Sequence, residues 1–257
     1  MSPGNCSAPA PVVLLHALFQ DSSMWEAQKA ELTRRGHRVV APDQRGFGRN
    51  PLGDSAPCMD LLADDVVRTL DKEGIDRAAF FGSSMGGYVA MAVLRRHPDR
   101  VLGLGLLASR ATADPPADRA NREKTAEQCL DGTARQRLYA QILPALVGAT
   151  THASRPAVIS RTAQTAHRMD PRSVAWALRA VADRPCSLAL LHETQLPALV
   201  VAGAEDRLVG LDEMRLAASA LRRGQLVTIP DAGHLPPLET PAPVTRAIHG
   251  LLTEIPC

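Results

Sequence analysis

Residues 78–87 read Ala-Ala-Phe-Phe-Gly-Ser-Ser-Met-Gly-Gly, and this stretch decides the fold. The apolar run at 78–81 predicts a short buried strand, and a helical pattern follows directly from 85 to 97. Between them, Gly82-x-Ser84-x-Gly86 is the pattern of a sharp strand-to-helix turn that presents a serine hydroxyl to a base. The stretch predicts an α/β fold with Ser84 as candidate nucleophile. The alternative is a glycine-rich connection in which Ser84 only caps a helix.

Short apolar runs alternate with longer helical patterns on both sides of this turn. Such alternation is typical of a mostly parallel, doubly wound sheet with helices on both faces. The predicted strands span residues 12–15, 38–41, 78–81, 101–107, 198–202 and 225–229. The predicted helices span residues 25–35, 59–73, 85–97, 211–222 and 242–254.

One region, residues 111–187, has helical patterns only. Pro156 and Pro171 fit the first turns of helices, where the N–H that proline lacks has no intrahelical partner to lose. We expect three or four helices here, forming a lid inserted between the fourth and fifth strands. The predicted domains are therefore a core of residues 1–110 and 188–257 and a helical lid of residues 111–187.

Composition predicts a globular protein with a small-molecule partner. The length of 257 residues suits one core with an insertion. The formal net charge is only +2. Its arginines are scattered among acidic residues, so we expect no binding to nucleic acid or to an anionic membrane. No segment approaches the ~18 uninterrupted apolar residues of a membrane span.

The cysteines are too widely spaced to predict a zinc site or a disulfide framework, because none stands at CxxC spacing or beside a histidine cluster. They are Cys6, Cys58, Cys129, Cys186 and Cys257. Residues 1–11 lack the basic start and the apolar stretch of a signal peptide. We therefore expect the protein in the reducing cytoplasm.

An acid and a histidine follow two later strands. Asp206 ends the turn Gly-Ala-Glu-Asp after the strand at 198–202, and His234 lies in a loop after the strand at 225–229. Carboxyl ends of parallel strands meet at one edge of a sheet, where ligands bind. The order Ser84, Asp206, His234 matches a serine-hydrolase triad, with Glu205 as the fallback acid. Taken singly, Asp206 could cap a turn and His234 could be merely solvated.

Together these segments closely resemble the α/β-hydrolase family, outside the predicted lid. The resemblance extends to Leu-Leu-His-Ala-Leu at 14–18 and Pro-Asp-Gln-Arg-Gly-Phe-Gly at 42–48. It is strongest to the compact esterase and lactonase branch, which includes enol-lactonases, haloperoxidase-type esterases and C–C bond hydrolases. The resemblance implies that the backbone N–H groups of Leu18 and Met85 form the oxyanion hole. Ala17 stands where relatives have glycine, which is harmless if its φ is negative.

These features predict a hydrolase that cleaves a small-molecule ester or lactone through an acyl-enzyme. Ser84 attacks the carbonyl, His234 moves the proton and Asp206 orients the imidazole. The chemistry requires no metal and no organic cofactor. The alternatives are a non-hydrolytic or C–C cleaving enzyme with the same site, and a receptor-like protein that only binds its ligand.

Three residues are candidate substrate contacts. Arg110, at the end of the fourth strand, either grips a substrate carboxylate or pairs with Asp114. Phe19 and Trp176 either contact the substrate or pack in the core and the lid.

Three other polar residues have predicted structural roles. Asp43 and Arg45 are expected to tie down their own glycine-rich loop, and His16 to brace the loop that bears Leu18.

Overall fold

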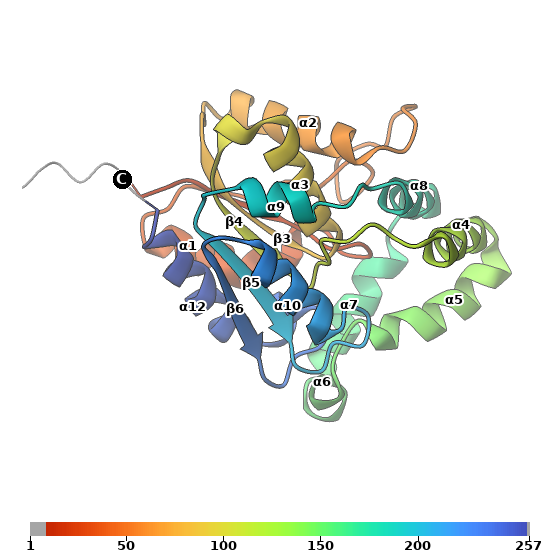
Figure 1. The fold of residues 1–257 in the computed structure, drawn as a ribbon. Coiled ribbons are helices and arrows are strands. Elements are labelled where there is room, and N and C mark those ends of the chain that lie inside the picture. The colour runs from red at the N-terminus through yellow and green to blue at the C-terminus, as the bar shows by residue number, and fades with distance from the viewer. Residues whose placement is uncertain (1–8, 256–257) are drawn as a thin grey trace, which may run out of the picture.

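The fold is built on a six-stranded sheet in which every neighbouring pair of strands is parallel. The computed structural model describes residues 9–255 (Figure 1). The strand order is β2-β1-β3-β4-β5-β6. The strands are β1 (Val12–Leu15), β2 (Val39–Val40), β3 (Ala78–Ser83), β4 (Val101–Leu107), β5 (Ala198–Gly203) and β6 (Gly224–Ile229). All six predicted strands are confirmed, although β2 is shorter than predicted.

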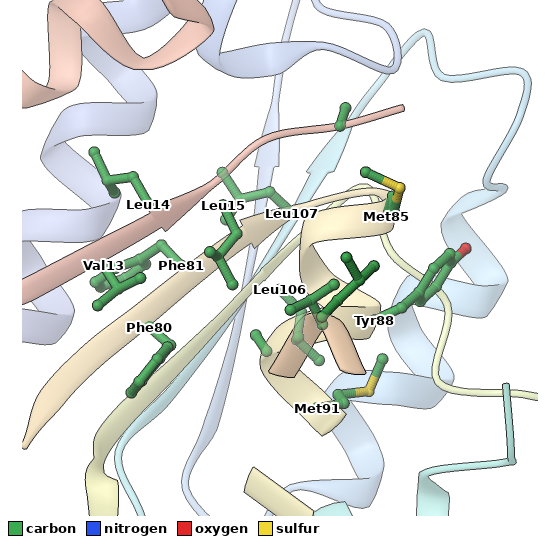
Figure 2. Packing of buried hydrophobic residues seen from close by; sticks show 14 of the residues in the cluster. Val13, Leu14, Leu15, Phe80, Phe81, Met85, Tyr88, Met91, Leu106 and Leu107 are labelled. Carbon is green, nitrogen blue, oxygen red and sulfur yellow. The ribbon is translucent and has the colours of Figure 1, made fainter. Parts of the chain in front are cut away.

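Continuous apolar runs form the central strands because both faces of the sheet are covered. Every residue of β1, β3 and β5 is buried, whereas the edge strand β6 keeps several residues exposed. Figure 2 shows Leu15 of β1, Phe81 of β3 and Leu107 of β4 in this core, with side chains of the helix after β3 packed beside them. The ends of these strands are therefore held by a rigid, buried sheet.

Helices cover the two faces of the sheet as predicted. On one face, α1 (Glu26–Arg34) packs against α12 (Pro241–Leu252). On the other, α2 (Met59–Lys72) packs against α3 (Met85–Arg96), and α10 (Leu211–Ala220) lies against β5 and β6 (Figure 1). Shorter helical segments are η1 (Ser22–Trp25), η2 (Pro98–Arg100), α9 (Leu188–Glu193) and α11 (Pro236–Glu239).

Five helices lie within residues 111–187, where three or four were predicted. They are α4 (Pro116–Leu130), α5 (Gly132–Ala145), α6 (Ala149–Ser154), α7 (Pro156–His167) and α8 (Pro171–Ala182). Asp131 separates α4 from α5, and its carboxylate accepts the N–H of Ala134 and caps α5. Pro156 and Pro171 begin helices, as predicted. Figure 1 shows these helices gathered on the side toward which the strand arrows point.

Three of the five cysteines lie within residues 9–255, and all three are free thiols. Cys58 and Cys186 are exposed, and Cys129 is buried. Cys6 and Cys257 lie outside the described residues. Over the same range, no helix is long and apolar enough to span a membrane, and no group of three or more His, Cys, Asp or Glu side chains is arranged to hold a metal ion.

A buried ion cluster fastens the two ends of the α4–α8 segment to each other. The Asp114 carboxylate, just before α4, accepts hydrogen bonds from Arg184 (2.6 Å) and from Arg122. Arg184 follows α8, and its guanidinium lies over the Tyr88 ring, 4.2 Å from the centroid. Burial raises the pKa of Asp114, but the hydrogen bonds from the two arginines outweigh it and hold the pKa at about 2.

Replacing this carboxylate should destabilise the protein in a pH-dependent way. Asp114→Asn leaves Arg184 buried without its counter-charge, so we expect a loss of about 3 kcal/mol in the free energy of unfolding at pH 7. The folded-state pKa is below the unfolded value of about 4. The carboxylate therefore stabilises the fold fully above pH ~4, and this advantage disappears as the pH falls toward about 2.

Urea unfolding followed by circular dichroism at several pH values measures this difference. The control is Asp212→Asn, because Asp212 is 96% exposed and pairs with Arg215 on the surface. We expect it to cost less than about 1 kcal/mol. Equal losses in the two variants would contradict the assignment of Asp114 as the anchor.

Candidate active site

Ser84 occupies a strained turn between β3 and α3. Its φ is 51° and its ψ is −113°, in a region that residues with a side chain rarely adopt. Glycines make the turn possible, because a Cβ at Gly82 would lie 2.1 Å from the Gly86 carbonyl oxygen. A Cβ at Gly86 would lie 2.2 Å from the carbonyl oxygen of Leu15. The backbone doubles back at this turn as the sequence predicted.

The structure brings Ser84, His234 and Asp206 into one chain of hydrogen bonds. His234 Nε2 lies 2.9 Å from Ser84 Oγ, and His234 Nδ1 lies 2.9 Å from Asp206 Oδ2. Because an ionised carboxylate only accepts, Nδ1 carries the proton and Nε2 is free to accept from the serine hydroxyl. The side chains of His234 and Asp206 are 6% and 2% exposed. This arrangement can activate a serine hydroxyl as a nucleophile.

The second oxygen of Asp206 fixes the carboxylate plane. Asp206 Oδ1 accepts the backbone N–H groups of Leu208 (2.8 Å) and Val209 (3.1 Å). Asp206 therefore caps its own turn and also accepts a hydrogen bond from His234. The sequence offered these two roles as alternatives, and the structure combines them.

The fallback acid, Glu205, has a different partner. Its carboxylate accepts from the hydroxyl and the backbone N–H (2.8 Å) of Thr150, at the start of α6. These hydrogen bonds lower the pKa of Glu205. Asp206 is thus the carboxylate that the structure places against His234.

The predicted oxyanion donors lie at the same site. Leu18, from the loop after β1, and Met85, the first residue of α3, line one cavity together with Ser84 and His234. Met85 opens the helix, where backbone N–H groups have no intrahelical acceptor. The two N–H groups thus belong to segments beside the serine.

His16 braces the loop that bears Leu18, as predicted. Its Nδ1 donates to the carbonyl oxygen of Ala17 (2.9 Å), and its Nε2 accepts the N–H of Gln44 (3.0 Å). Burial lowers the pKa of His16, which keeps the ring neutral in this bridging role. Ala17 has no positive φ, so alanine fits where relatives have glycine, whereas Phe19 adopts a φ of 63°.

The glycine-rich loop after β2 is held as predicted. Asp43 accepts the N–H groups of Ser22 (2.9 Å) and Arg49 (3.1 Å). Arg45 donates to the carbonyl oxygen of Leu52 (3.0 Å) and pairs with Asp65 of α2 (2.7 Å). Both residues have structural roles beside the site.

A cavity of about 350 Å³ opens onto Ser84 and has two unlike walls. Its apolar wall comes mainly from α5 and α8, through Ile142, Leu146, Leu178 and Val181. Its polar wall comes from α4, through Asp118, Asn121, Arg122 and Thr125. These α4 residues were missed in the sequence, although their spacing of three and four places them on one helical face.

Two of the three candidate substrate contacts line this cavity. Phe19 does so while packing edge-to-face on Tyr139, with ring centroids 5.5 Å apart. Arg110 also lines it, and donates to the Leu208 carbonyl oxygen (3.1 Å). The guanidinium of Arg110 lies 3.9 Å from Asp114 and 3.5 Å from Asp118, so it pairs with acidic side chains, and its contact with a substrate carboxylate stays a prediction.

Trp176 is not brought to this cavity. Its side chain is buried on α8, and its indole N–H donates to the carbonyl oxygen of Ser55 (2.7 Å). Trp176 therefore has the alternative, packing role, because the hydrogen bond directs its ring toward the loop before α2.

Comparisons with known proteins identify the family of this chain. A family model described as alpha/beta hydrolase fold matches residues 10–241. The chain is similar to the structure of a thermophilic esterase from Thermogutta terrifontis with malate bound, at a TM-score of 0.92 and 36% identity, covering 97% of this chain and 91% of that one. It is also similar to the enol-lactonase from Burkholderia xenovorans, at 0.86 and 27% identity, covering 97% and 94%.

A curated relative, the 2-hydroxymuconate semialdehyde hydrolase of a Pseudomonas species, is 26% identical over 271 residues, covering 97% of this chain and 89% of its own. The family model covers most of the chain and includes the strained serine turn. The chain therefore belongs to the alpha/beta hydrolase fold family.

Proposed function

We propose that this protein hydrolyses a small-molecule ester or lactone through an acyl-enzyme formed on Ser84. The observation that carries this proposal is the unbroken chain of hydrogen bonds from Asp206 through His234 to Ser84 Oγ, which ends in a cavity. The similarity to an esterase and to an enol-lactonase supports the choice of ester or lactone. The cavity volume suits a small molecule.

The reaction proceeds in two half-reactions. His234 Nε2 takes the hydroxyl proton as Ser84 Oγ attacks the carbonyl carbon, and then gives it to the departing alkoxide. Water enters, loses a proton to His234 and attacks the acyl-enzyme, and the proton returns to Ser84 as the acid departs. Asp206 stabilises the imidazolium in both halves, so no step uses a metal or an organic cofactor.

The backbone N–H groups of Leu18 and Met85 stabilise the oxyanion in this proposal. Each donor of this kind contributes about 10²- to 10³-fold to turnover. Phe19 and Arg110 are the proposed substrate contacts, because both line the cavity. The helices of residues 111–187 act as the lid that sets the size and polarity of the pocket.

The nucleophile and its acid should be identified by p-nitrophenyl ester hydrolysis. We expect Ser84→Ala to abolish turnover and covalent labelling by a fluorophosphonate. Asp206→Asn should reduce kcat about 10⁴-fold, because the amide no longer fixes the productive imidazole tautomer.

Ser160→Ala, at an exposed site on α7, is the matched control and should behave as wild type. A fluorophosphonate adduct that persists in Ser84→Ala, or a folded wild type that forms no adduct and hydrolyses no ester, would refute the proposal.

Adding one methyl group at position 86 should displace the loop that carries Leu18, the proposed oxyanion donor. In Gly86→Ala, the new Cβ meets the Leu15 carbonyl oxygen, so the segment leading to Leu18 must move. We expect kcat for p-nitrophenyl acetate to fall about 10²-fold or more. Gly250→Ala is the control, because a Cβ at Gly250 meets nothing within 4 Å. Unchanged kcat in Gly86→Ala would exclude the proposed oxyanion geometry.

A further inference from the structure

The loop that carries His234 is held by a buried carboxylate. Glu239, the last residue of α11, is only 3% exposed. Its Oε1 accepts the backbone N–H groups of Gly233 (2.9 Å) and Leu235 (3.1 Å). These N–H groups belong to the residues on either side of His234, so one oxygen fixes the backbone from which the imidazole projects.

The second oxygen of Glu239 holds a distant part of the chain. Glu239 Oε2 accepts the N–H of Gly148 (2.7 Å) and the hydroxyl of Thr151 (2.7 Å), both at the start of α6. A carboxylate offers about four lone-pair sites, and four donors occupy them here. The buried charge is thereby compensated by hydrogen bonds, which a buried carboxylate requires.

Two further contacts press α6 onto the same loop. A Cβ at Gly233 would lie 2.3 Å from Gly148 N, so the two backbones touch with no room for a side chain. Arg155 donates to the Thr151 hydroxyl (3.0 Å) and to the carbonyl oxygen of Asp231 (2.6 Å). Figure 1 shows α6 beside the loops that follow β5 and β6.

We propose that Glu239 is a positioning residue for His234, and that through it α6 is a fixed part of the active site. The inference rests on the proposed function, since it assigns a role in presenting the imidazole to Ser84. Misplacement of a reacting group by about 1 Å costs roughly 10²-fold in rate. Holding the peptides that flank His234 therefore affects turnover more than substrate binding.

The chemistry of the amide makes Glu239→Gln an informative variant. Its NH₂ group meets only N–H donors on the His234 side, but on the α6 side the Thr151 hydroxyl can rotate and accept from it. Glutamine should therefore keep the contacts to Gly233 and Leu235 and lose the one to Gly148. Glu239→Ala loses all four, and Thr151→Val loses one.

The test uses the full chain, with kcat and KM for p-nitrophenyl acetate and the rate of fluorophosphonate labelling. We expect kcat to fall about 10²-fold in Glu239→Ala, about tenfold in Glu239→Gln and less in Thr151→Val, with KM within about threefold of wild type. The downfield proton resonance of His234 Nδ1–H should persist in Glu239→Gln and weaken in Glu239→Ala.

Wild-type kcat in folded Glu239→Ala would overturn the proposal, as would a lowered melting temperature with an unchanged labelling rate. If Glu239→Ala does not fold, Glu239→Gln decides, and wild-type kcat in that variant would overturn the proposal. A wild type that turns over no ester would contradict the proposed function instead. The imidazole resonance would still report whether Glu239 positions His234.

Discussion

The site depends on how closely two backbone segments approach each other beneath Ser84. The turn after β3 folds back on itself and lies against the end of β1, at separations that only glycine at positions 82 and 86 allows. The buried sheet holds both segments in this contact. Hydrogen bonds to His16 and Gln44 then fix the loop that bears Leu18, so the position of the serine and that of the proposed oxyanion donors are set together.

Backbone strain collects at the same edge of the sheet. The residues other than glycine that have positive φ are Phe19, Ser84, Ala108 and Asp231, within residues 9–255. Each follows a different strand, namely β1, β3, β4 or β6. Strained conformations of this kind cost about 1–3 kcal/mol each and persist only where the surroundings enforce them. Burial in the sheet core therefore offsets the conformational free energy that the strained residues at this edge cost.

The elements of the core could be predicted because their signals are local. The buried runs of β1, β3 and β5 and the turn at Ser84 are continuous in sequence, and the chain order of Ser84, Asp206 and His234 identified the partners. The α4–α8 region was harder, because its helix breaks depend on single caps such as Asp131 and its polar cavity wall carries no motif. The roles of Trp176 and Glu239 could not be predicted, because their hydrogen-bond partners are distant in the chain and only the folded structure reveals them.

The separation of Ser84 from His234 along the chain also determines when the site can exist during folding. The hydrogen bond between them joins residues 150 positions apart, and the Glu239–Gly148 contact spans 91. Contacts of such long range form only after large loops have closed, which makes them slow steps in folding. A chain that has formed only its helices and its short-range contacts does not yet hold His234 beside Ser84. The hydrogen bond between Ser84 and His234 is therefore a marker of completed folding, which forms late on refolding and is lost when the β6 edge of the sheet detaches.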